Sequence, residues 1–396
     1  MAYGDTASDE TLARAWAEFC DTLKGAGEIL FQDSAPATPL DRAVGFRFLS
    51  RSIPLALGFE LENADPLFPD LMRYFEPTRK QGGDNPDALY LGAPIDGSLS
   101  YRLRGNRGSA HFLAFTSMRR TPGPWGSEVV DTLFGHQLQT EADGSFELHV
   151  GPDEKSGNWL RTAPDCFRLT IRQFFNDWNR EDPMTVSLER LGAEGPPPLL
   201  TPDGVADGLR RAGEWVASSA RYWADAIDVW QARPNEFLPW RALESGKTDA
   251  TPGGVPLVCY WTVEPDEVLL IEVTPPDAHF WNIEFGNYRF ETMDYRYRMS
   301  SINSHQGVLE EDGSLRIAVC HDDPGLPNWL DPSGHREGYA TFRWMHADAE
   351  PVPACRKLRR ADLEAALPAG VRRISAEERR EALRRRKQGI ERRFRA

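Results

Sequence analysis

The sequence predicts an α+β protein made of two tandem β-sandwich-like modules of jelly-roll type, with a helical N-terminal region, a helical connector and a basic C-terminal helix. Three observations predict this fold. The chain has 396 residues, more than one ordinary hydrophobic core contains. Stretches that alternate between apolar and polar residues are separated by segments with helical periodicity. The landmarks of the first alternating region recur, in the same order, in the second.

The recurring landmarks are five short motifs whose spacing stays between 168 and 171 residues. They are Ala110-His111-Phe112 with Ala278-His279-Phe280, His136-Gln137 with His305-Gln306, Asp143-Gly144-Ser145 with Asp312-Gly313-Ser314, Asn158-Trp159-Leu160 with Asn328-Trp329-Leu330, and Arg172 with Arg343. Five matches in order indicate tandem copies of one β module. We expect the copies to pack about a pseudo-twofold axis, with the cleft between them as the default position for a ligand.

The N-terminal region, residues 1–82, has the periodicity of helices. Apolar residues recur at three- and four-residue steps and predict an amphipathic helix over residues 9–31. A second helix is predicted over residues 40–59, with proline breaks at Pro39 and Pro54.

The two β modules are assigned to residues 83–195 and 255–350. In the first, alternation bounded by turn residues predicts strands over residues 100–105, 111–116, 145–150 and 166–175. The connector, residues 196–254, contains a predicted helix over residues 202–230, because its apolar side chains follow a period of 3.6. The tail, residues 351–396, ends in a predicted basic helix over residues 375–395.

Composition disfavours several classes of protein. Asp and Glu outnumber Lys and Arg by 60 to 46, and the last 41 residues carry a net +9, so the first 355 carry −23. An acidic body disfavours nucleic acid and polyanions as partners. No run approaches the roughly 18 apolar residues of a membrane span, and no basic-then-apolar leader opens the sequence. Five scattered cysteines suit reduced thiols, so we expect a cytoplasmic protein.

A set of motifs extends over both modules. They are Asn85-Pro86-Asp87 with Tyr90, Tyr101-Arg102-Leu103-Arg104-Gly105, Asp323-Pro324-Gly325, and Asn328-Trp329-Leu330-Asp331 followed by Gly334, Glu337-Gly338 and Arg343-Trp344. Together they resemble the bacterial "domain of unknown function" family 1214, which is often found beside a partner domain numbered 1254. The resemblance implies two β-sandwich-like units with helical additions. A carbohydrate-related role is suggested for relatives by analogy of fold alone.

The loop from Asp331 to Glu337 is the first candidate for chemistry. Asp331, His335 and Glu337 bring two carboxylates and an imidazole within seven residues, which suits a general acid–base pair. The alternative is a β-turn in which Asp331 bonds its own backbone and Gly334 adopts a positive φ. The first copy lacks these polar residues after its tryptophan, so a single site would belong to the second module.

Asn328 and Trp329 have counterparts in the first copy, so one interpretation is a structural corner shared by both modules. The other is a platform on which a sugar ring stacks. His279 also has a counterpart, His111, and is either structural or a proton partner of the acidic loop. Further substrate-binding candidates are Arg343, Trp281, Tyr295 and Asn85, which supply an orienting charge, aromatic surface and an amide.

The sequence therefore favours an enzyme or enzyme-like binder of an uncharged hydroxylated small molecule, such as a sugar, polyol or sterol-like alcohol, in a cleft of the second module. The alternative is a non-catalytic carbohydrate-binding or scaffold module; whether the chain is an enzyme stays open. No nucleotide-binding loop, HxH or HExxH motif occurs, so no cofactor and no metal are expected. A small-molecule ligand is the expected partner, without nucleic acid or membrane, and a homo-oligomer is compatible with the sequence.

Overall fold

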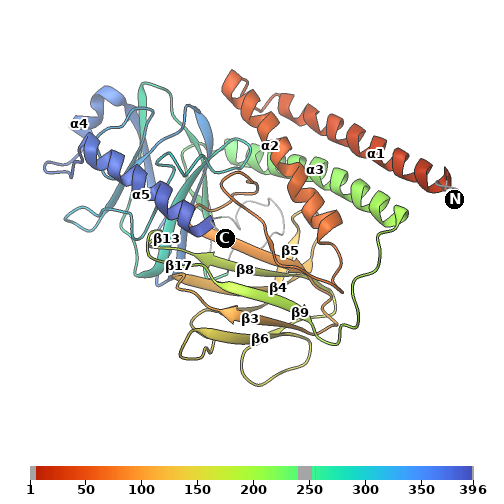
Figure 1. The fold of residues 1–396 in the computed structure, drawn as a ribbon. Helices are drawn as coiled ribbons and strands as arrows, with labels where there is room; N and C mark the ends of the chain where they lie inside the picture. Colours follow the sequence, from red (N-terminus) through yellow and green to blue (C-terminus); the bar gives the residue numbers. More distant parts are fainter. Residues whose placement is uncertain (1–5, 240–251, 255, 395–396) are drawn as a thin grey trace.

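The computed structural model describes residues 6–239, 252–254 and 256–394 (Figure 1). Its helices are α1 (Thr6–Ala26), α2 (Pro39–Leu57), α3 (Pro202–Gln231), α4 (Leu363–Ala366) and α5 (Ala376–Phe394), with short 3-10 or π turns at Gly27–Phe31, Gly58–Glu62 and Arg360–Asp362. The first-module strands are β1 (Met72–Arg73), β2 (Ala88–Pro94), β3 (Tyr101–Asn106), β4 (Phe112–Arg120), β5 (Ser127–Phe134), β6 (Ser145–Gly151), β7 (Trp159–Arg161), β8 (Cys166–Phe174) and β9 (Thr185–Arg190). The second-module strands are β10 (Leu238–Pro239), β11 (Leu257–Thr262), β12 (Glu267–Val273), β13 (Ala278–Asn287), β14 (Ser301–Asn303), β15 (Leu315–Val319), β16 (Trp329–Leu330), β17 (Glu337–Ala347) and β18 (Ala354–Arg359).

The two modules have the same topology. In the first, a five-stranded sheet in the order β1-β2-β8-β4-β5 faces a four-stranded sheet in the order β7-β6-β3-β9. In the second, the orders are β10-β11-β17-β13-β14 and β16-β15-β12-β18, which repeat the first strand for strand. Even the parallel pair recurs, as β6 with β7 and β15 with β16. The predicted duplication and the α+β fold are confirmed.

Each module has its own core between its two sheets. Side chains such as Leu103 on β3 and Phe115 on β4 fill the first, and Ile271 on β12 and Ile283 on β13 fill the second. Alternate residues of a strand point to opposite faces, so the five-stranded sheets also present an outer face away from these cores. The pocket described below lies on those outer faces.

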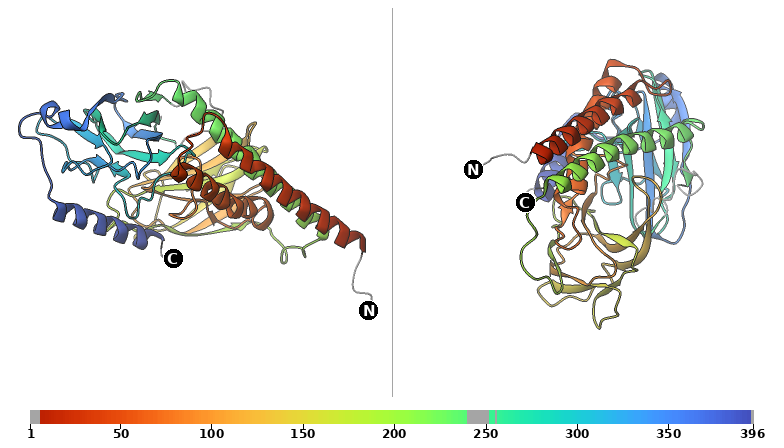
Figure 2. Two further views of the ribbon diagram at one scale, coloured as in Figure 1. Left: turned by 90° about the horizontal axis from the view of Figure 1, so that it is seen from above. Right: turned by 90° about the vertical axis from the view of Figure 1, so that its right-hand side faces the viewer.

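Helices cover the outer faces of the five-stranded sheets (Figure 2). α3 begins at a Thr201 cap, whose side chain accepts from Gly204 N, and has Pro202 in its first turn. Its first half packs with α1 and α2 against the first sheet, and its second half packs against the second. One long helix therefore spans both modules. Within the described residues, no helix combines the length and the apolar character of a membrane span.

α5 lies across both modules (Figure 1), and we call it the arginine strap after the three arginines on its buried face. Its buried face carries Arg379, Arg386 and Arg393, spaced seven residues apart. Arg379 bonds Asp323 of the second module at 2.9 Å, and Arg393 donates to the Pro86 carbonyl of the first at 2.6 Å. The predicted basic helix exists, but buried contacts to the body hold it in addition to surface ion pairs.

Three details differ from the sequence-based expectation. The tail is not wholly helical, because β18 pairs with β12 and completes the four-stranded sheet of the second module. The connector includes β10, which pairs with β11. Pro54 does not break α2 as expected, since burial of the flanking helix against the first sheet stabilises the next turn. The predicted boundary between residues 254 and 255, and the predicted helix end at residue 395, fall on or beside positions outside the described residues.

Candidate functional site

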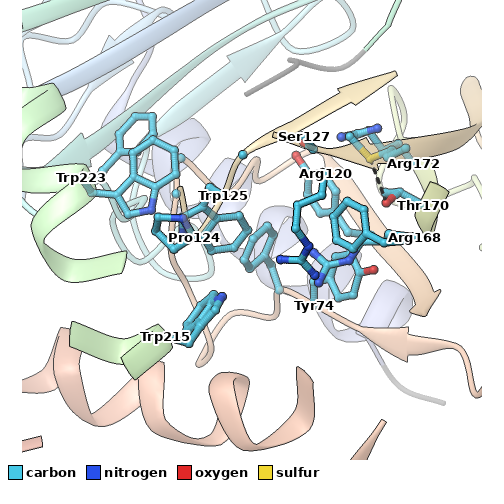
Figure 3. A pocket seen from close by; sticks show the side chains of 18 of the residues that line it. Tyr74, Arg120, Pro124, Trp125, Ser127, Arg168, Thr170, Arg172, Trp215 and Trp223 are labelled. Atoms are coloured by element: carbon cyan, nitrogen blue, oxygen red, sulfur yellow. Dashed lines mark hydrogen bonds between the residues drawn. The ribbon is translucent and has the colours of Figure 1, made fainter. Parts of the chain in front are cut away.

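A pocket of about 160 Å³ lies where the two modules meet α3. Residues of β8 and β17, one strand from each module, form part of its wall, and α3 contributes Trp215 and Trp223. Figure 3 shows Trp125, Trp215 and Trp223 on one side and Arg120 and Arg168 beside Tyr74 on the other. The duplication therefore places a cleft between the copies, where a ligand site is most commonly found.

The duplication also gives the pocket two copies of one Thr-x-Arg motif. Thr170 and Arg172 on β8 line it from the first module, and Thr341 and Arg343 on β17 line it from the second. The intervening residues Ile171 and Phe342 lie in the two sandwich cores. Because side chains alternate along a strand, burial of the middle residue directs both outer side chains into the pocket.

The two arginines of this motif have different partners. Arg343 forms an ion pair with Glu284 on β13, with Nη1 to Oε2 at 2.9 Å. Arg172 donates instead to Thr116 Oγ1 on β4 at 3.1 Å. Thr116 and Glu284 occupy equivalent positions. Thr116 pairs across the sheet with Thr170, and Glu284 pairs across the sheet with Thr341. Burial raises the pKa of Glu284 to about 8, although Arg343 acts in the opposite direction.

A β-bulge places Phe167 beside Arg168 on the pocket face of β8. Along β8 and β4 the register shifts between Met118 and Arg119, so that Phe167 is the extra residue. Cys166 and Leu169 both lie in the sandwich core although they are three residues apart. A bulge of this kind turns two successive side chains to one face, and here Phe167 and Arg168 both line the pocket.

Arg120 and Arg168 form a pair of like charges at the pocket. Their guanidinium carbons lie 4.3 and 5.1 Å from the centre of the same Phe167 ring. Burial, and after it the charge of Arg168, lowers the pKa of Arg120, while Glu60 acts in the opposite direction. Within the part of the chain that the structure describes, neither arginine forms an ion pair, and the nearby Glu60 is paired with Arg211 at 3.4 Å.

The opposite wall is aromatic. Trp125 lies in the turn between β4 and β5, and its ring centre is 5.3 Å from that of Trp215 and 5.9 Å from that of Trp223. Phe290 of the second module packs against Trp223 at 4.7 Å. Such a wall excludes water and offers flat apolar surface to a ring or chain.

The loop from Asp331 to Glu337, predicted to carry an acid–base pair, lies outside the pocket. Asp331 accepts from Arg298 Nη1 at 2.8 Å and from the backbone of Ser333 at 2.7 Å. His335 Nδ1 lies 2.6 Å from Asp41 Oδ1 of α2, and Glu337 accepts from the Tyr260 hydroxyl at 2.6 Å. These three side chains have three separate sets of partners. None lines the pocket, and Asp331 makes the turn of the alternative interpretation.

The other predicted residues are distributed over structural contacts. Asn328 donates to Val308 O at 2.7 Å and accepts from Val308 N at 2.9 Å, and Asn158 makes the same two bonds with Gln139. Trp329 donates its indole N–H to Cys320 O at 2.8 Å. The shared motif is therefore a corner that fixes each module.

His279 lies in the contact between the modules, where its Nε2 donates to the His111 carbonyl at 3.0 Å. Asn85 accepts from Asn282 Nδ2 at 2.9 Å, Trp281 packs in the second core, and the ring of Tyr295 lies 4.1 Å from Lys80 Nζ. Of the ten residues proposed from the sequence, Arg343 is the one that lines the pocket.

Arg120, Arg168 and the three tryptophans of the pocket are not among the residues predicted from the sequence. The alternation Arg168-x-Thr170-x-Arg172 is a usable signal, because it places three polar side chains on one face of a strand otherwise buried. Trp223 lies on the apolar face of the helix predicted over residues 202–230, but helical periodicity does not show that this face borders a pocket.

Comparisons with known proteins agree with this architecture. The model of the family described as "Protein of unknown function (DUF1214)" matches residues 90–175 and 268–349, one segment in each module. A solved structure of an uncharacterized protein from Burkholderia cenocepacia is 36% identical, with a TM-score of 0.84, covering 89% of this chain and 99% of that one. A solved structure from Vibrio parahaemolyticus has 13% identity and a TM-score of 0.46 over 79% of this chain and 98% of that one, too distant to bear on the site. No curated protein matches the chain.

Proposed function

This chain belongs to the DUF1214 family of proteins of unknown function, and from its pocket we propose that it binds a small organic anion with an apolar body. The observation that carries the proposal is the pair Arg120 and Arg168, two cations on one aromatic ring without an ion-pair partner among the described residues. Guanidinium groups bind carboxylates and phosphates through directed, charge-assisted hydrogen bonds. A bound anion would remove the repulsion between the two.

The apolar part of the ligand is inferred from the opposite wall. Trp125 packs against both Trp215 and Trp223, so the three rings form one continuous apolar surface. An aromatic ring or short hydrocarbon chain would contact these faces while its charged end met the arginines. Small-molecule sites commonly combine a mainly apolar lining with a few placed polar groups.

The acidic net charge of the chain disfavours a ligand that carries several negative charges. The formal net charge is −14, so the field at a distance opposes anions while the local field of the pocket attracts them. A monoanion such as an aromatic carboxylate is favoured over a polyanion. The proposed ligand therefore differs in charge from the uncharged ligand expected from the sequence.

An uncharged hydroxylated ligand remains the second candidate, in this pocket and not in a cleft of the second module. The hydroxyls of Ser127, Thr170 and Thr341 line the pocket with the tryptophans. Thr341 Oγ1 is buried and has no hydrogen-bond partner in the described residues. Hydroxyl groups beside an aromatic face suit a sugar or an alcohol.

Calorimetric titration with matched probes separates the candidates. Benzoate and benzyl alcohol share the ring and differ in charge, and phenyl phosphate tests a second anion. The proposal expects benzoate or phenyl phosphate to bind and benzyl alcohol to bind at least about 10-fold more weakly, as loss of a charged hydrogen bond predicts. Equal binding of benzyl alcohol would favour the second candidate. Failure of all three probes would count against both.

A further inference from the structure

We propose that Glu284 takes up a proton when an anion binds Arg343, so that the pocket accepts an organic acid as an anion together with a proton. This inference rests on the proposed function and adds a regulatory property to the same site. Glu284 itself does not line the pocket, whereas its partner Arg343 does. An anion therefore reaches the guanidinium from the pocket side, with Glu284 on the other.

The ion pair is incomplete, which leaves Arg343 able to accept a second anion. Glu284 is fully buried, and only its Oε2 bonds Arg343, at 2.9 Å. Glu284 Oε1 and Arg343 Nε are both buried without a hydrogen-bond partner among the described residues. A guanidinium and a carboxylate can form two parallel bonds, so one bond is missing from this pair. Unused donors and acceptors in a buried pair indicate a contact that a ligand can compete for.

The charges around Glu284 oppose a second anion unless a proton enters with it. Arg343 and Tyr339 face Glu284 from β17, Tyr90 from β2, and Asp84 and Asp87 from the loop before β2. Burial raises the pKa of Glu284 to about 8, and Arg343 is the largest influence that lowers it. If the ligand engages Arg343, that influence weakens and the pKa of Glu284 rises further.

One proton enters the buried cluster with each anion that binds Arg343. Above about pH 8, where Glu284 is ionised in the free protein, the arginine cation faces one carboxylate before binding. Afterwards it faces the ligand anion, while Glu284 carries a proton taken from solvent. The net charge of the buried cluster is unchanged. Without the proton, two anions would share one buried cation, and an uncompensated buried charge is strongly unfavourable.

The first module supplies a natural control. Its Arg172 has the neutral Thr116 at the position that Glu284 occupies in the second module. A threonine is thus compatible with this position of the fold. Glu284→Thr copies the first module, and Glu284→Gln keeps the shape of the side chain without a titrating group.

The test is titration of the full-length protein with benzoate in two buffers of different ionisation enthalpy, which gives the protons taken up per ligand. At pH 8, where Glu284 is half protonated in the free protein, we expect uptake of at most about half a proton for the wild type, rising toward about one proton at higher pH, and none for either variant. Wild-type affinity should fall by up to about 10-fold per pH unit above pH 8, and the variants should stay level.

Benzoate binding without proton uptake, or with the same pH dependence in wild type and variants, overturns the inference and leaves the proposed function standing. Absence of benzoate and phenyl phosphate binding at every pH overturns both. A ligand-free measurement checks Glu284 separately. Because its folded pKa is raised, the stability it contributes is present at low pH and lost as pH rises through about 8. Parallel stability curves for wild type and both variants would also overturn the inference.

Discussion

The rings of His111 and His279 stack with centres 4.4 Å apart, and each donates through Nε2 to the backbone carbonyl of the other, at 2.8 and 3.0 Å. The two residues are equivalent positions of the duplicated module. The contact is reciprocal: His111 bonds His279 in the same way as His279 bonds His111. Such reciprocity is the property of a twofold interface between identical subunits. The chain is therefore a covalently linked pair of modules, and its pocket lies where the two copies face one another.

This reciprocity predicts that the two histidines have equal and coupled effects on stability. His111→Ala and His279→Ala should each lower the free energy of unfolding by about 1 kcal/mol, the value of one ordinary hydrogen bond. A double-mutant cycle measured by urea denaturation should show coupling of about 0.5 kcal/mol or more. Neither substitution should alter benzoate affinity. A loss of affinity for His279→Ala alone would support the ligand-handling role that the sequence suggested.

Removing an arginine from the pocket should weaken anion binding selectively. Arg168→Gln loses a charge-assisted bond and should reduce benzoate affinity about 10- to 100-fold in calorimetry. Arg14→Gln removes the same charge from an exposed position on α1 and should have little effect. If both variants lose affinity equally, binding depends on the general field of the protein and not on the pocket.

The polar loop of the second module should be dispensable for ligand binding. Glu337 bonds Tyr260 and Asp331 bonds Arg298, and both contacts lie outside the pocket. Glu337→Gln should therefore leave benzoate affinity within about twofold, with a change in unfolding free energy of about 1 kcal/mol. A large loss of affinity with unchanged stability would restore this loop as the functional site.

The arginine strap should contribute strongly to stability. Arg393 is buried, donates to Pro86 O at 2.6 Å and lies over the rings of Phe175 and Trp178 at 4.5 and 4.8 Å. Arg393→Ala should lower the unfolding free energy by about 2–4 kcal/mol, because it removes packing and leaves a buried carbonyl unbonded. Arg385→Ala, at an exposed position of the same helix, should change it by less than about 0.5 kcal/mol. Equal effects would mean that α5 is not docked through its buried face.

Much of the fold could be predicted from the sequence because it depends on local periodicity and on the repeat. The helix predicted over residues 202–230 is α3, and four predicted strands are β3, β4, β6 and β8 with small shifts at their ends. The break expected at Pro54, inside the helix predicted over residues 40–59, is absent from α2 because tertiary burial outweighs the local cost of the proline. Periodicity shows which residues share a face of a helix or strand. Which other elements that face contacts is decided by the packing of segments distant in the sequence.

The site was harder to predict for the same reason. Arg168 follows the regular alternation of β8, but no local pattern shows that this face of β8 lies beside β17 and α3 in a pocket. The bulge that turns Phe167 to the same face is not visible in the sequence either. The loop from Asp331 to Glu337 was predicted as a site because it is polar. Its polar groups are bonded by partners distant in the chain, among them Asp41, which is 294 residues from His335. A polar motif alone does not distinguish a satisfied corner from a site.

The most direct measurement of the central claim is a crystal structure of the full chain with benzoate. We predict the carboxylate within hydrogen-bond distance of at least one of the pocket guanidinium groups, those of Arg120, Arg168 and Arg343, and the ring against Trp125. Benzoate bound in the second module beside Glu337 and Asp331, or a pocket that stays without benzoate while calorimetry shows binding, would contradict the account.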